Sequence, residues 1–494
     1  MNRPLRHLFV MVVAMFLAIM ASTTFTQFVS AAALNNDARN VRTIYREYGR
    51  DRGPIIAADG QILAESVPVD SPFRYLRVFS GGDAQQAEMY APVTGYFSVA
   101  NGTTAIERAE NDWLNGTAPA LWVHRLRGIL TGAAAQGASV QTTIVPAVQQ
   151  AAWDALGGQR GAVIALDPRT GAIIAMVSKP SFDPNELSLH STAAAGTRFQ
   201  ELVAEADDPL INRTIGALYP PGSSFKLVPA AAALETSVVR PDQLIPAPVT
   251  YTLPGTSHAL RNFGGATCSP TDEMTLAQAM VVSCNTAFAM LGVELGAARM
   301  AAQAQRFGFD SPFEVPMRAA ISNFPDDDGA FTPDRQALAG IGQGDVTATP
   351  LQMAVVASAI ARNGTLMQPY LVQNIRDAQL DTVFEAQPHA LRQAMTANTA
   401  IELRNMMVET VARGTGTAAA IPGVQVAGKT GTAQTAAGVA PHAWFVAFAP
   451  ADDPVVALAV VVENGGDLAS DATGGRVAAP IARAVIHATL AANQ

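Results

Sequence analysis

The order of apolar segments predicts an α+β fold, in which an antiparallel sheet carries layers of helix. Two nearly all-apolar stretches, 161–166 and 172–177, flank the turn 167–171, a pattern typical of a hairpin in a sheet that is covered on both faces. Alanine-rich helical stretches follow, then a second run of apolar strands, and a last helix ends the region. This order of strands, helices and strands is the basis of the predicted fold class.

The expected elements can be placed along the chain. A helix over 146–156 has proline in its first turn, which suits a helix start. The other expected helices cover about 226–235, 274–292, 351–363, 398–412 and 477–491, and the late strands cover 426–432, 443–448 and 455–462. Nearer the start, apolar runs around Asp59-Gly60 predict a β-hairpin over 52–64. Residues 70–140 have no strong periodicity and receive no assignment.

The first thirty residues differ from the rest. Arg3 and Arg6 precede fourteen residues, 8–21, without a polar side chain, and softer sequence continues to Val29, so the segment reaches the roughly 20 residues that span a bilayer. It is either a retained signal anchor or a signal peptide that is cleaved after Ala31-Ala32-Ala33. We favour the anchor. Arginines after the segment do not favour an inside N-terminus, but long downstream domains cross largely regardless of such charge.

Length and composition set the remaining bounds. A chain of 494 residues is too long for one compact core. We expect a cytoplasmic tip and anchor at 1–33, a smaller non-catalytic domain at 34–143 and the main domain at 144–494. The net charge of −9 and the lack of a basic run argue against a nucleic-acid partner.

Lysine use is the first pointer to chemistry. The chain has three lysines against twenty-nine arginines, and two of the three, Lys226 and Lys429, lie in motif-like surroundings. Arginine stays protonated in proteins, whereas lysine can lose its proton and act as a base. The third, Lys179, has no such surroundings.

Ser223 and Lys226 form the first candidate pair. Tyr219-Pro220-Pro221-Gly222 cannot continue a helix, so Ser223 should open one, with Lys226 one turn later on the same face. A neutral lysine there could take the serine proton without any histidine. Pro229 allows a bend or a short first helical segment.

Two further motifs supply groups that such a site needs. Ser283-Cys284-Asn285 lies between two helical stretches, where a hydroxyl can relay a proton and an amide can hold a peptide group. The run Lys429, Thr430, Gly431, Thr432 is read as a strand, beside which an extended peptide could lie.

Cys268 and Cys284 are the only cysteines. In an exported protein they could form a disulfide, and two free buried cysteines are the alternative. The sequence leaves both open. His442 precedes a strand and is interpreted as structural, and no His/Cys cluster has zinc spacing, so we expect no metal.

The three motifs stand in the order Ser-x-x-Lys, Ser-x-Asn, Lys-Thr-Gly, which is the signature of penicillin-binding proteins and serine β-lactamases. The chain resembles the class B penicillin-binding proteins, and among them the small enzymes of actinobacteria. Further matching stretches include 180–185, 342–344, 349–354 and 442–445, and the Arg52-Gly53 hairpin resembles the opening motif of the class B N-terminal region.

The resemblance implies a D,D-transpeptidase that cross-links peptidoglycan without a cofactor. Ser223 would attack the penultimate D-Ala carbonyl of a stem peptide, Lys226 would act as base, Ser283 would relay the proton and Asn285 would bind the substrate amide. Backbone N–H groups of Ser223 and Thr432 would form the oxyanion hole. The expected substrate-binding residues are Asn285, Lys429, Thr430, Gly431 and Thr432.

The resemblance also implies partners and a location. Stem peptides and lipid-linked precursors would be substrates, β-lactams would acylate Ser223, and a lipid II polymerase of the SEDS type would be the protein partner. The protein would be a single-pass protein of the cell membrane with an extracytoplasmic catalytic domain, with D-Ala-D-Ala carboxypeptidation as a side activity.

Three other functions were weighed. A β-lactamase needs a route to activate water, and the sequence has neither an Asp at position 284 nor a convincing glutamate motif for that step. A β-lactam sensor usually has several membrane spans, and only one is visible. A non-catalytic divisome scaffold predicts broken motifs, yet all three are intact.

Overall fold

The structure of the chain is a computed structural model. It describes residues 2–29, 48–71, 73–122, 136–325, 331–436 and 438–493. The alternative cleavage pattern Ala31–Ala33 and the expected boundary between residues 33 and 34 lie outside the described residues.

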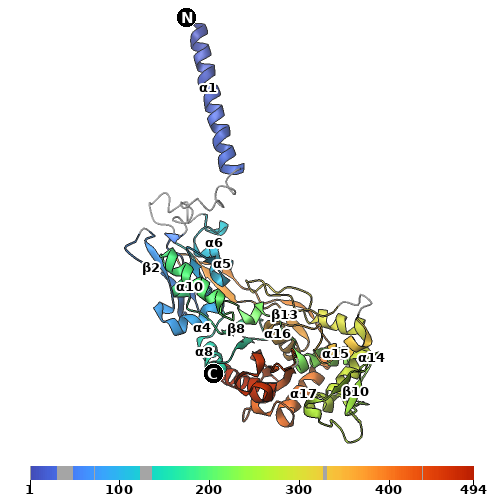
Figure 1. Ribbon diagram of the computed structural model, residues 1–494. Helices are drawn as coiled ribbons and strands as arrows, with labels where there is room; N and C mark the ends of the chain where they lie inside the picture. The colour runs from blue at the N-terminus through green and yellow to red at the C-terminus, as the bar shows by residue number, and fades with distance from the viewer. Residues whose placement is uncertain are drawn as a thin grey trace.

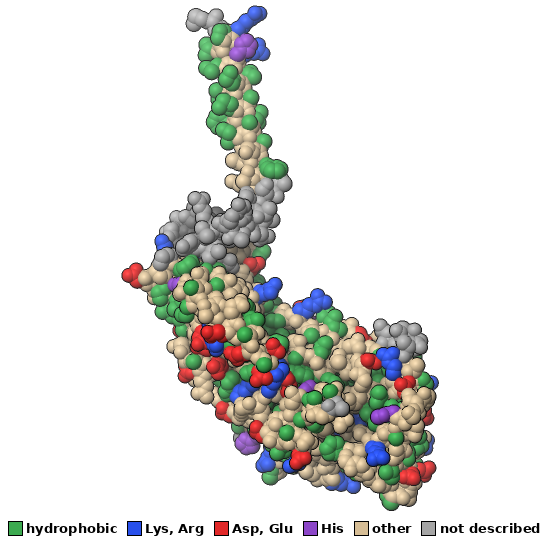
Figure 2. Space-filling view, in the orientation of Figure 1, with side chains coloured by type: hydrophobic (Ala, Val, Ile, Leu, Met, Phe, Trp, Pro, Cys, Tyr) green, Lys and Arg blue, Asp and Glu red, His purple; other side chains and the backbone are tan. Residues whose placement is uncertain are grey.

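The N-terminal apolar segment is helical. Helix α1 covers Asn2–Thr24, and one turn of π-helix, η1, extends it over Phe25–Val29. Among the described residues, Arg3–Gln27 is the one stretch that is long and apolar enough to cross a membrane. Figure 2 shows hydrophobic side chains along this helix and basic side chains at its start. Their full exposure leaves the apolar surface unpaired, as a membrane anchor requires.

The predicted hairpin over 52–64 is confirmed. Strands β1 (Ile55–Ile56) and β2 (Ile62–Pro68) pair antiparallel, and Gly60 takes a φ of 93° in the turn between them. A left-handed turn residue of this kind is why Asp-Gly signals a hairpin. The unassigned region that follows contains β3 (Tyr75–Phe79), η2 (Ser80–Gly82), α4 (Ala84–Thr94), β4 (Phe97–Ser98), β5 (Gly102–Thr103), α5 (Ala105–Ala109), α6 (Asn111–Leu114), η3 (Pro119–Leu121) and β6 (Ser139–Thr142).

A buried ion cluster holds this region together. Glu107 accepts from Arg52 Nη2 and from Arg77 Nε, both at 2.6 Å, and all three side chains are buried. The two guanidiniums hold the pKa of Glu107 below its ordinary value against the opposing effect of burial, which is the largest single influence. Breaking such a buried group is far more costly than breaking a surface pair, so Arg52 fixes the start of the hairpin.

The sheet of this region draws on two distant parts of the chain. Its six strands run in the order β15-β14-β6-β1-β2-β3, where β14 is Val372–Arg376 and β15 is Thr382–Glu385. Strand β14 pairs antiparallel with β6 in the register Ile375↔Val140. The sheet therefore joins strands from before and after residue 144.

The second sheet confirms the predicted α+β class. Five strands run in the order β17-β18-β19-β7-β8 and every neighbouring pair is antiparallel. They are β7 (Gly161–Leu166), β8 (Ile173–Lys179), β17 (Ala427–Ala433), β18 (His442–Ala449) and β19 (Val456–Val462). All residues of β7, β18 and β19 are buried, so both faces of the sheet are covered.

Helices provide the two covering layers. Helices α8 (Pro146–Leu156) and α18 (Ala479–Ala492) pack together on one face (Figure 1). On the other face lies α16 (Pro350–Ala361), all of whose residues are buried, and α17 (Ala397–Arg413) packs beside it. A helix that is apolar all round is expected in such a central layer.

The remaining elements connect these layers or surround the cavity described below. They are α9 (Pro184–Leu187), α10 (Thr192–Ala204), α11 (Arg213–Gly216), η4 (Gly222–Lys226), α12 (Leu227–Glu235), β9 (Leu244–Pro246), β10 (Thr250–Thr252), β11 (Ala259–Arg261), η5 (Phe263–Gly265), β12 (Glu273–Thr275), α13 (Leu276–Val282), α14 (Asn285–Arg306), α15 (Pro333–Ala339), β13 (Thr365–Met367), β16 (Ala390–Gln393), η6 (Thr417–Ala419), η7 (Glu463–Asp471) and η8 (Gly474–Ala478).

Candidate active site

Ser223 opens a helix, as the sequence predicts, but the first turn is tighter than an α-helix. Residues Gly222–Lys226 form the 3₁₀ helix η4, and α12 continues from Leu227. Pro229 is the third residue of α12. Because the first N–H groups of a helix have no partner within it, proline breaks no hydrogen bond there. The short first segment is therefore the 3₁₀ turn that carries the serine and the lysine.

The turn before Ser223 is held from three sides. Gly222 N donates to Gly342 O at 2.9 Å, and Trp444 Nε1 donates to Pro220 O at 3.0 Å. Gly222 has a φ of 53°, and a Cβ there would come within 2.8 Å of the Thr432 carbonyl oxygen. Glycine is required at this position on both grounds, and the turn before Ser223 is packed tightly against β17.

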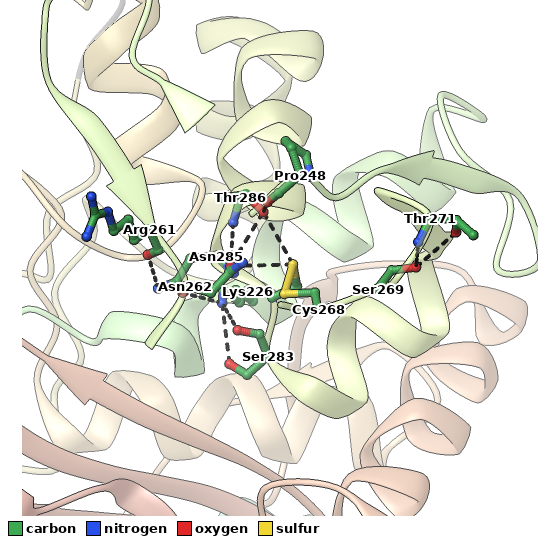
Figure 3. Close-up of a disulfide and its surroundings, with 11 residues drawn as sticks. Lys226, Pro248, Arg261, Asn262, Cys268, Ser269, Thr271, Ser283, Asn285 and Thr286 are labelled. Carbon is green, nitrogen blue, oxygen red and sulfur yellow. Dashed lines mark hydrogen bonds between the residues drawn. A yellow bond between two sulfur atoms is a disulfide. The ribbon is translucent and has the colours of Figure 1, made fainter. Parts of the chain in front are cut away.

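Lys226 is fully buried and directed at the second motif (Figure 3). Its Nζ donates to Ser283 O at 2.8 Å, to Asn285 Oδ1 at 2.8 Å and to Ser283 Oγ at 3.3 Å. In the part of the chain that the structure describes, Ser223 Oγ is not among its hydrogen-bond partners. The lysine is thus not a solvated surface residue.

Ser283 is the point where the three motifs meet. Lys429 Nζ donates to Ser283 Oγ at 2.8 Å, and Lys226 Nζ approaches the same oxygen at 3.3 Å. Ser283 follows α13 and has a φ of 60° and a ψ of 44°. These angles lie in the left-handed region, which residues other than glycine rarely adopt. Strain of this kind persists only where surrounding contacts hold it. Here it turns both the carbonyl and the hydroxyl of Ser283 toward Lys226.

Burial changes the proton affinity of both lysines. The pKa of Lys226 lies well below its ordinary value, because burial disfavours the charged form and because the Lys429 charge is close. Burial also lowers the pKa of Lys429 to about 7. Neither amine has a carboxylate partner among the described residues, so burial and the neighbouring charge both favour a neutral amine at this site.

Strand β17 presents its residues to two different surroundings. Thr430 and Thr432 line a cavity, whereas Lys429 is buried, reaches Ser283 and donates to Thr430 O at 3.0 Å. This is the alternation expected of a strand. Gly431 lies against the turn before Ser223, where a Cβ would come within 2.8 Å of the Pro221 oxygen. The glycine in this strand therefore allows β17 and η4 to approach each other.

The cavity joins the candidate residues into one site. Its volume is about 820 Å³, and its lining includes Ser223, Ser283, Asn285, Thr430 and Thr432. The two site lysines lie behind this lining rather than in it. Ser223 thus borders a ligand-sized space, and the two amines are buried behind the lining of that space.

The two cysteines form a disulfide (Figure 3), so the alternative of two free thiols is wrong. Their Cα atoms are 5.9 Å apart, and Cys284 is the middle residue of the Ser-x-Asn motif. The bridge ties that motif to the loop that contains η5. A break between two helices is thereby fixed covalently.

Asn262 positions the second motif, and the sequence did not reveal this role. The residue before α14, Cys284, has no side chain that can cap the helix, and Asn262 Oδ1 accepts from Asn285 N at 2.9 Å and from Thr286 N at 3.1 Å instead. Asparagine caps helices well, but here it comes from a distant loop. No local sequence pattern reveals such a cap.

Two other residues have structural surroundings. His442 Nδ1 accepts from Asn464 N at 3.1 Å, its ring packs edge-on to Tyr219, and burial lowers its pKa. Lys179, the third lysine, donates to Trp153 O and Gly157 O at the end of α8. Within the described ranges no group of three or more His, Cys, Asp or Glu residues could hold a metal ion.

Comparisons with known proteins agree with this geometry. Residues 161–487 match the family model of the penicillin binding protein transpeptidase domain, and residues 52–140 match that of the penicillin binding protein A dimerisation domain. The peptidoglycan D,D-transpeptidase PbpA of Mycolicibacterium smegmatis is 45% identical over 502 residues, with 99% of each chain covered. The same enzyme of Mycobacterium tuberculosis is 44% identical over 503 residues, again with 99% of each chain covered.

Solved structures are similar as well. The ceftriaxone acyl-enzyme complex of penicillin-binding protein A from M. tuberculosis superposes with a TM-score of 0.86 at 43% identity and covers 90% of this chain and 100% of its own. The penicillin G acyl-enzyme complex of that protein gives a TM-score of 0.83 at 42% identity, over 89% of this chain and 100% of its own.

Proposed function

Since the chain belongs to the penicillin-binding protein transpeptidases, we propose that Ser223 is the residue that forms its acyl-enzyme. The function is that of a serine-type peptidoglycan D,D-transpeptidase in cell-wall synthesis, an activity that β-lactams inhibit covalently. The observation that carries the assignment of Ser223 is its position in the cavity lining, one helical turn from a buried lysine of lowered pKa.

The first step is attack by Ser223 Oγ on the penultimate D-Ala carbonyl of the donor peptide. Neutral Lys226 accepts the serine proton, and the Ser283 hydroxyl, hydrogen-bonded to Lys226, passes a proton to the departing D-Ala nitrogen. A serine O–C bond forms while the peptide C–N bond breaks. In the site without substrate, the Lys226 amine is hydrogen-bonded to Ser283 and Asn285. Catalytic hydrogen bonds often tighten only when substrate is bound.

Backbone donors stabilise the charge that develops on the carbonyl oxygen. We assign this role to the N–H groups of Ser223 and Thr432, because η4 and β17 pack against each other at Gly222 and Gly431. One such donor typically contributes about 3 kcal/mol to the transition state.

Strand β17 and Asn285 hold the peptide on either side of the scissile bond. Thr430 and Thr432 face the cavity and bind the terminal carboxylate. The charge of Lys429, which lies behind the cavity lining, attracts the same carboxylate. Asn285 uses Oδ1 for Lys226 and one amide hydrogen for Arg261 O, at 3.3 Å. An amide has two N–H donors, so one remains for a substrate carbonyl.

The acyl-enzyme is resolved by an amine of a neighbouring stem peptide, which forms the cross-link and restores Ser223. We further propose that α1 anchors the chain as a single membrane span, with the cavity on the extracytoplasmic side where peptidoglycan lies. A lipid II polymerase of the SEDS type is the proposed protein partner.

A fluorescent penicillin tests the assignment of the nucleophile. Ser223→Ala should take up no covalent label, whereas Ser224→Ala, which alters the neighbouring buried serine, should still be labelled. Ser224 Oγ donates to Pro221 O at 2.6 Å, and Ser224 is not among the residues that line the cavity. Label retained on Ser223→Ala and lost from Ser224→Ala would refute the proposal.

A further inference from the structure

The cavity is more basic than the chain that contains it. The whole protein has a net charge of −9, yet among the described residues that line the cavity none is Asp or Glu. The charged or titratable side chains in the lining are Arg261 and His258, and both are exposed. Lys226 and Lys429 lie behind the lining. A cleft with charges of one sign attracts ligands of the other.

Arg261 is the permanently charged side chain in the lining of this cavity. It ends β11, and its guanidinium forms no hydrogen bond or ion pair with the described residues. In Figure 3 its side chain extends away from the Lys226–Ser283 contact and beyond Asn262. The guanidinium is therefore outside the hydrogen-bond network of Lys226 and Ser283, so it is assigned to binding rather than to the bond-breaking step.

The surroundings of Arg261 also have more donors than acceptors. Asn262 Nδ2 is buried and has no hydrogen-bond partner among the described residues. A buried donor without an acceptor is uncommon and unfavourable. With the two lysines nearby, this wall of the cavity can accommodate added negative charge better than added positive charge.

The position of Arg261 separates it from the site proposed for the terminal carboxylate. That carboxylate is assigned to β17, which belongs to the five-stranded sheet, whereas β11 pairs with β10 in a separate two-stranded sheet. The carbonyl of Arg261 accepts from Asn285 Nδ2, so Arg261 adjoins the residue assigned to the substrate amide on the acyl side. A second anionic group of the donor would meet Arg261 on that side.

We propose that Arg261 determines specificity by binding a carboxylate on the acyl side of the donor, on the residue that precedes the D-Ala-D-Ala pair. The inference rests on the proposed function, since it takes Ser223 as the acylated residue. A guanidinium can bind a carboxylate through two parallel hydrogen bonds. His258 adds a second donor in the same lining.

The test compares two penicillins that differ by one carboxylate. Carbenicillin is benzylpenicillin with a carboxylate added to its acyl side chain, and the second-order acylation rate constant is measured for both on the full-length protein. In Arg261→Gln the ratio of the carbenicillin rate constant to the benzylpenicillin rate constant should fall about tenfold. In Arg261→Lys, which keeps the charge but not the paired donors, it should fall less. A ratio is independent of the fraction of folded enzyme.

Arg318→Gln is the matched control, because Arg318 is exposed, lies 3.8 Å from Glu314 and is not part of the cavity lining. It should leave the ratio unchanged. The wild-type ratio should also decrease with added salt. Two donor peptides with glutamate or glutamine before D-Ala-D-Ala should repeat the result.

An unchanged ratio in Arg261→Gln, or an equal fall in Arg318→Gln, would overturn the inference while leaving the nucleophile assignment intact. A wild-type protein that neither penicillin acylates would overturn the proposed function instead.

Discussion

Replacing Lys429 with methionine should stabilise the protein while it removes the activity. Lys429 is fully buried, and burial lowers its pKa from the ordinary 10.5 to about 7. The charged form of this amine therefore has a less favourable free energy in the folded state than in the unfolded state. Methionine has a similar length and no charge, so it removes that unfavourable contribution.

The size of the effect follows from the pKa. Each unit of pKa difference corresponds to about 1.4 kcal/mol. The difference of 3.5 between 10.5 and about 7 thus corresponds to about 5 kcal/mol. The methionine variant also lacks the hydrogen bonds to Ser283 Oγ and Thr430 O. The loss of each hydrogen bond reduces the gain by about 1 to 1.5 kcal/mol. A net gain of about 2 kcal/mol remains, or about 3 °C in thermal midpoint for a unit of this length.

The gain should depend on pH in a defined direction. Because the folded pKa of Lys429 is lower than the unfolded pKa, the unfolded chain binds more protons between about 7 and 10.5. The unfavourable contribution of Lys429 is complete below about pH 7 and disappears as the pH rises toward 10.5. Thermal unfolding of the wild type and Lys429→Met at about pH 6 and about pH 9 should show a smaller difference at the higher pH.

Lys179→Met provides the control, since Lys179 donates to two carbonyls at the end of α8 and lies 3.8 Å from the Trp153 ring centre. Burial also lowers the pKa of Lys179, but the same exchange there removes these favourable contacts, so the midpoint should rise less than in Lys429→Met. A lower midpoint for Lys429→Met, or a difference that grows with pH, would show that the buried amine is not an unfavourable charge.

Two further variants examine the base and the bridge. Lys226→Arg should lose at least about 100-fold in acylation rate, because arginine keeps its charge and cannot accept the serine proton. Near-normal acylation of this variant in a stopped-flow experiment would show that the lysine acts only through its charge. Reduction of the Cys268–Cys284 disulfide should lower the thermal midpoint, by a loss of about 3 kcal/mol in the chain-entropy model, and slow acylation because Cys284 separates Ser283 from Asn285. Intact-mass measurement should find no alkylation before reduction and two alkyl groups after it, so alkylation without a reductant would contradict the bridge.

The sequence predicts well those parts of the molecule that local patterns determine. The all-apolar strands of the second sheet, the helices that cover it and the helix start at Ser223 follow from periodicity and from the Pro-Pro-Gly turn. Lysine in an arginine-rich chain marks the two amines that the structure buries together. Strand alternation already separates Lys429 from Thr430 and Thr432.

Contacts between distant segments account for what the sequence did not reveal. The short elements of 70–140 owe their order to tertiary contacts such as the Arg52–Glu107 pair rather than to propensity. The helix cap from Asn262 comes from a loop 23 residues before Asn285. The spacing of the two cysteines allowed a bridge but did not require one, since bridging depends on where their Cα atoms lie.

The pairing of β14 with β6 has a mechanical consequence. Strand β14 lies between its own hairpin partner β15 and β6, in the same sheet as β1 and β2. Force applied along β1 or β6 would therefore act on ladder hydrogen bonds of the sheet that contains β14. A truncation at residue 144 would leave the edge of β14 bare and prone to pair with other chains. The shared sheet thus links the N-terminal strands to the part of the chain that contains Ser223 through backbone hydrogen bonds.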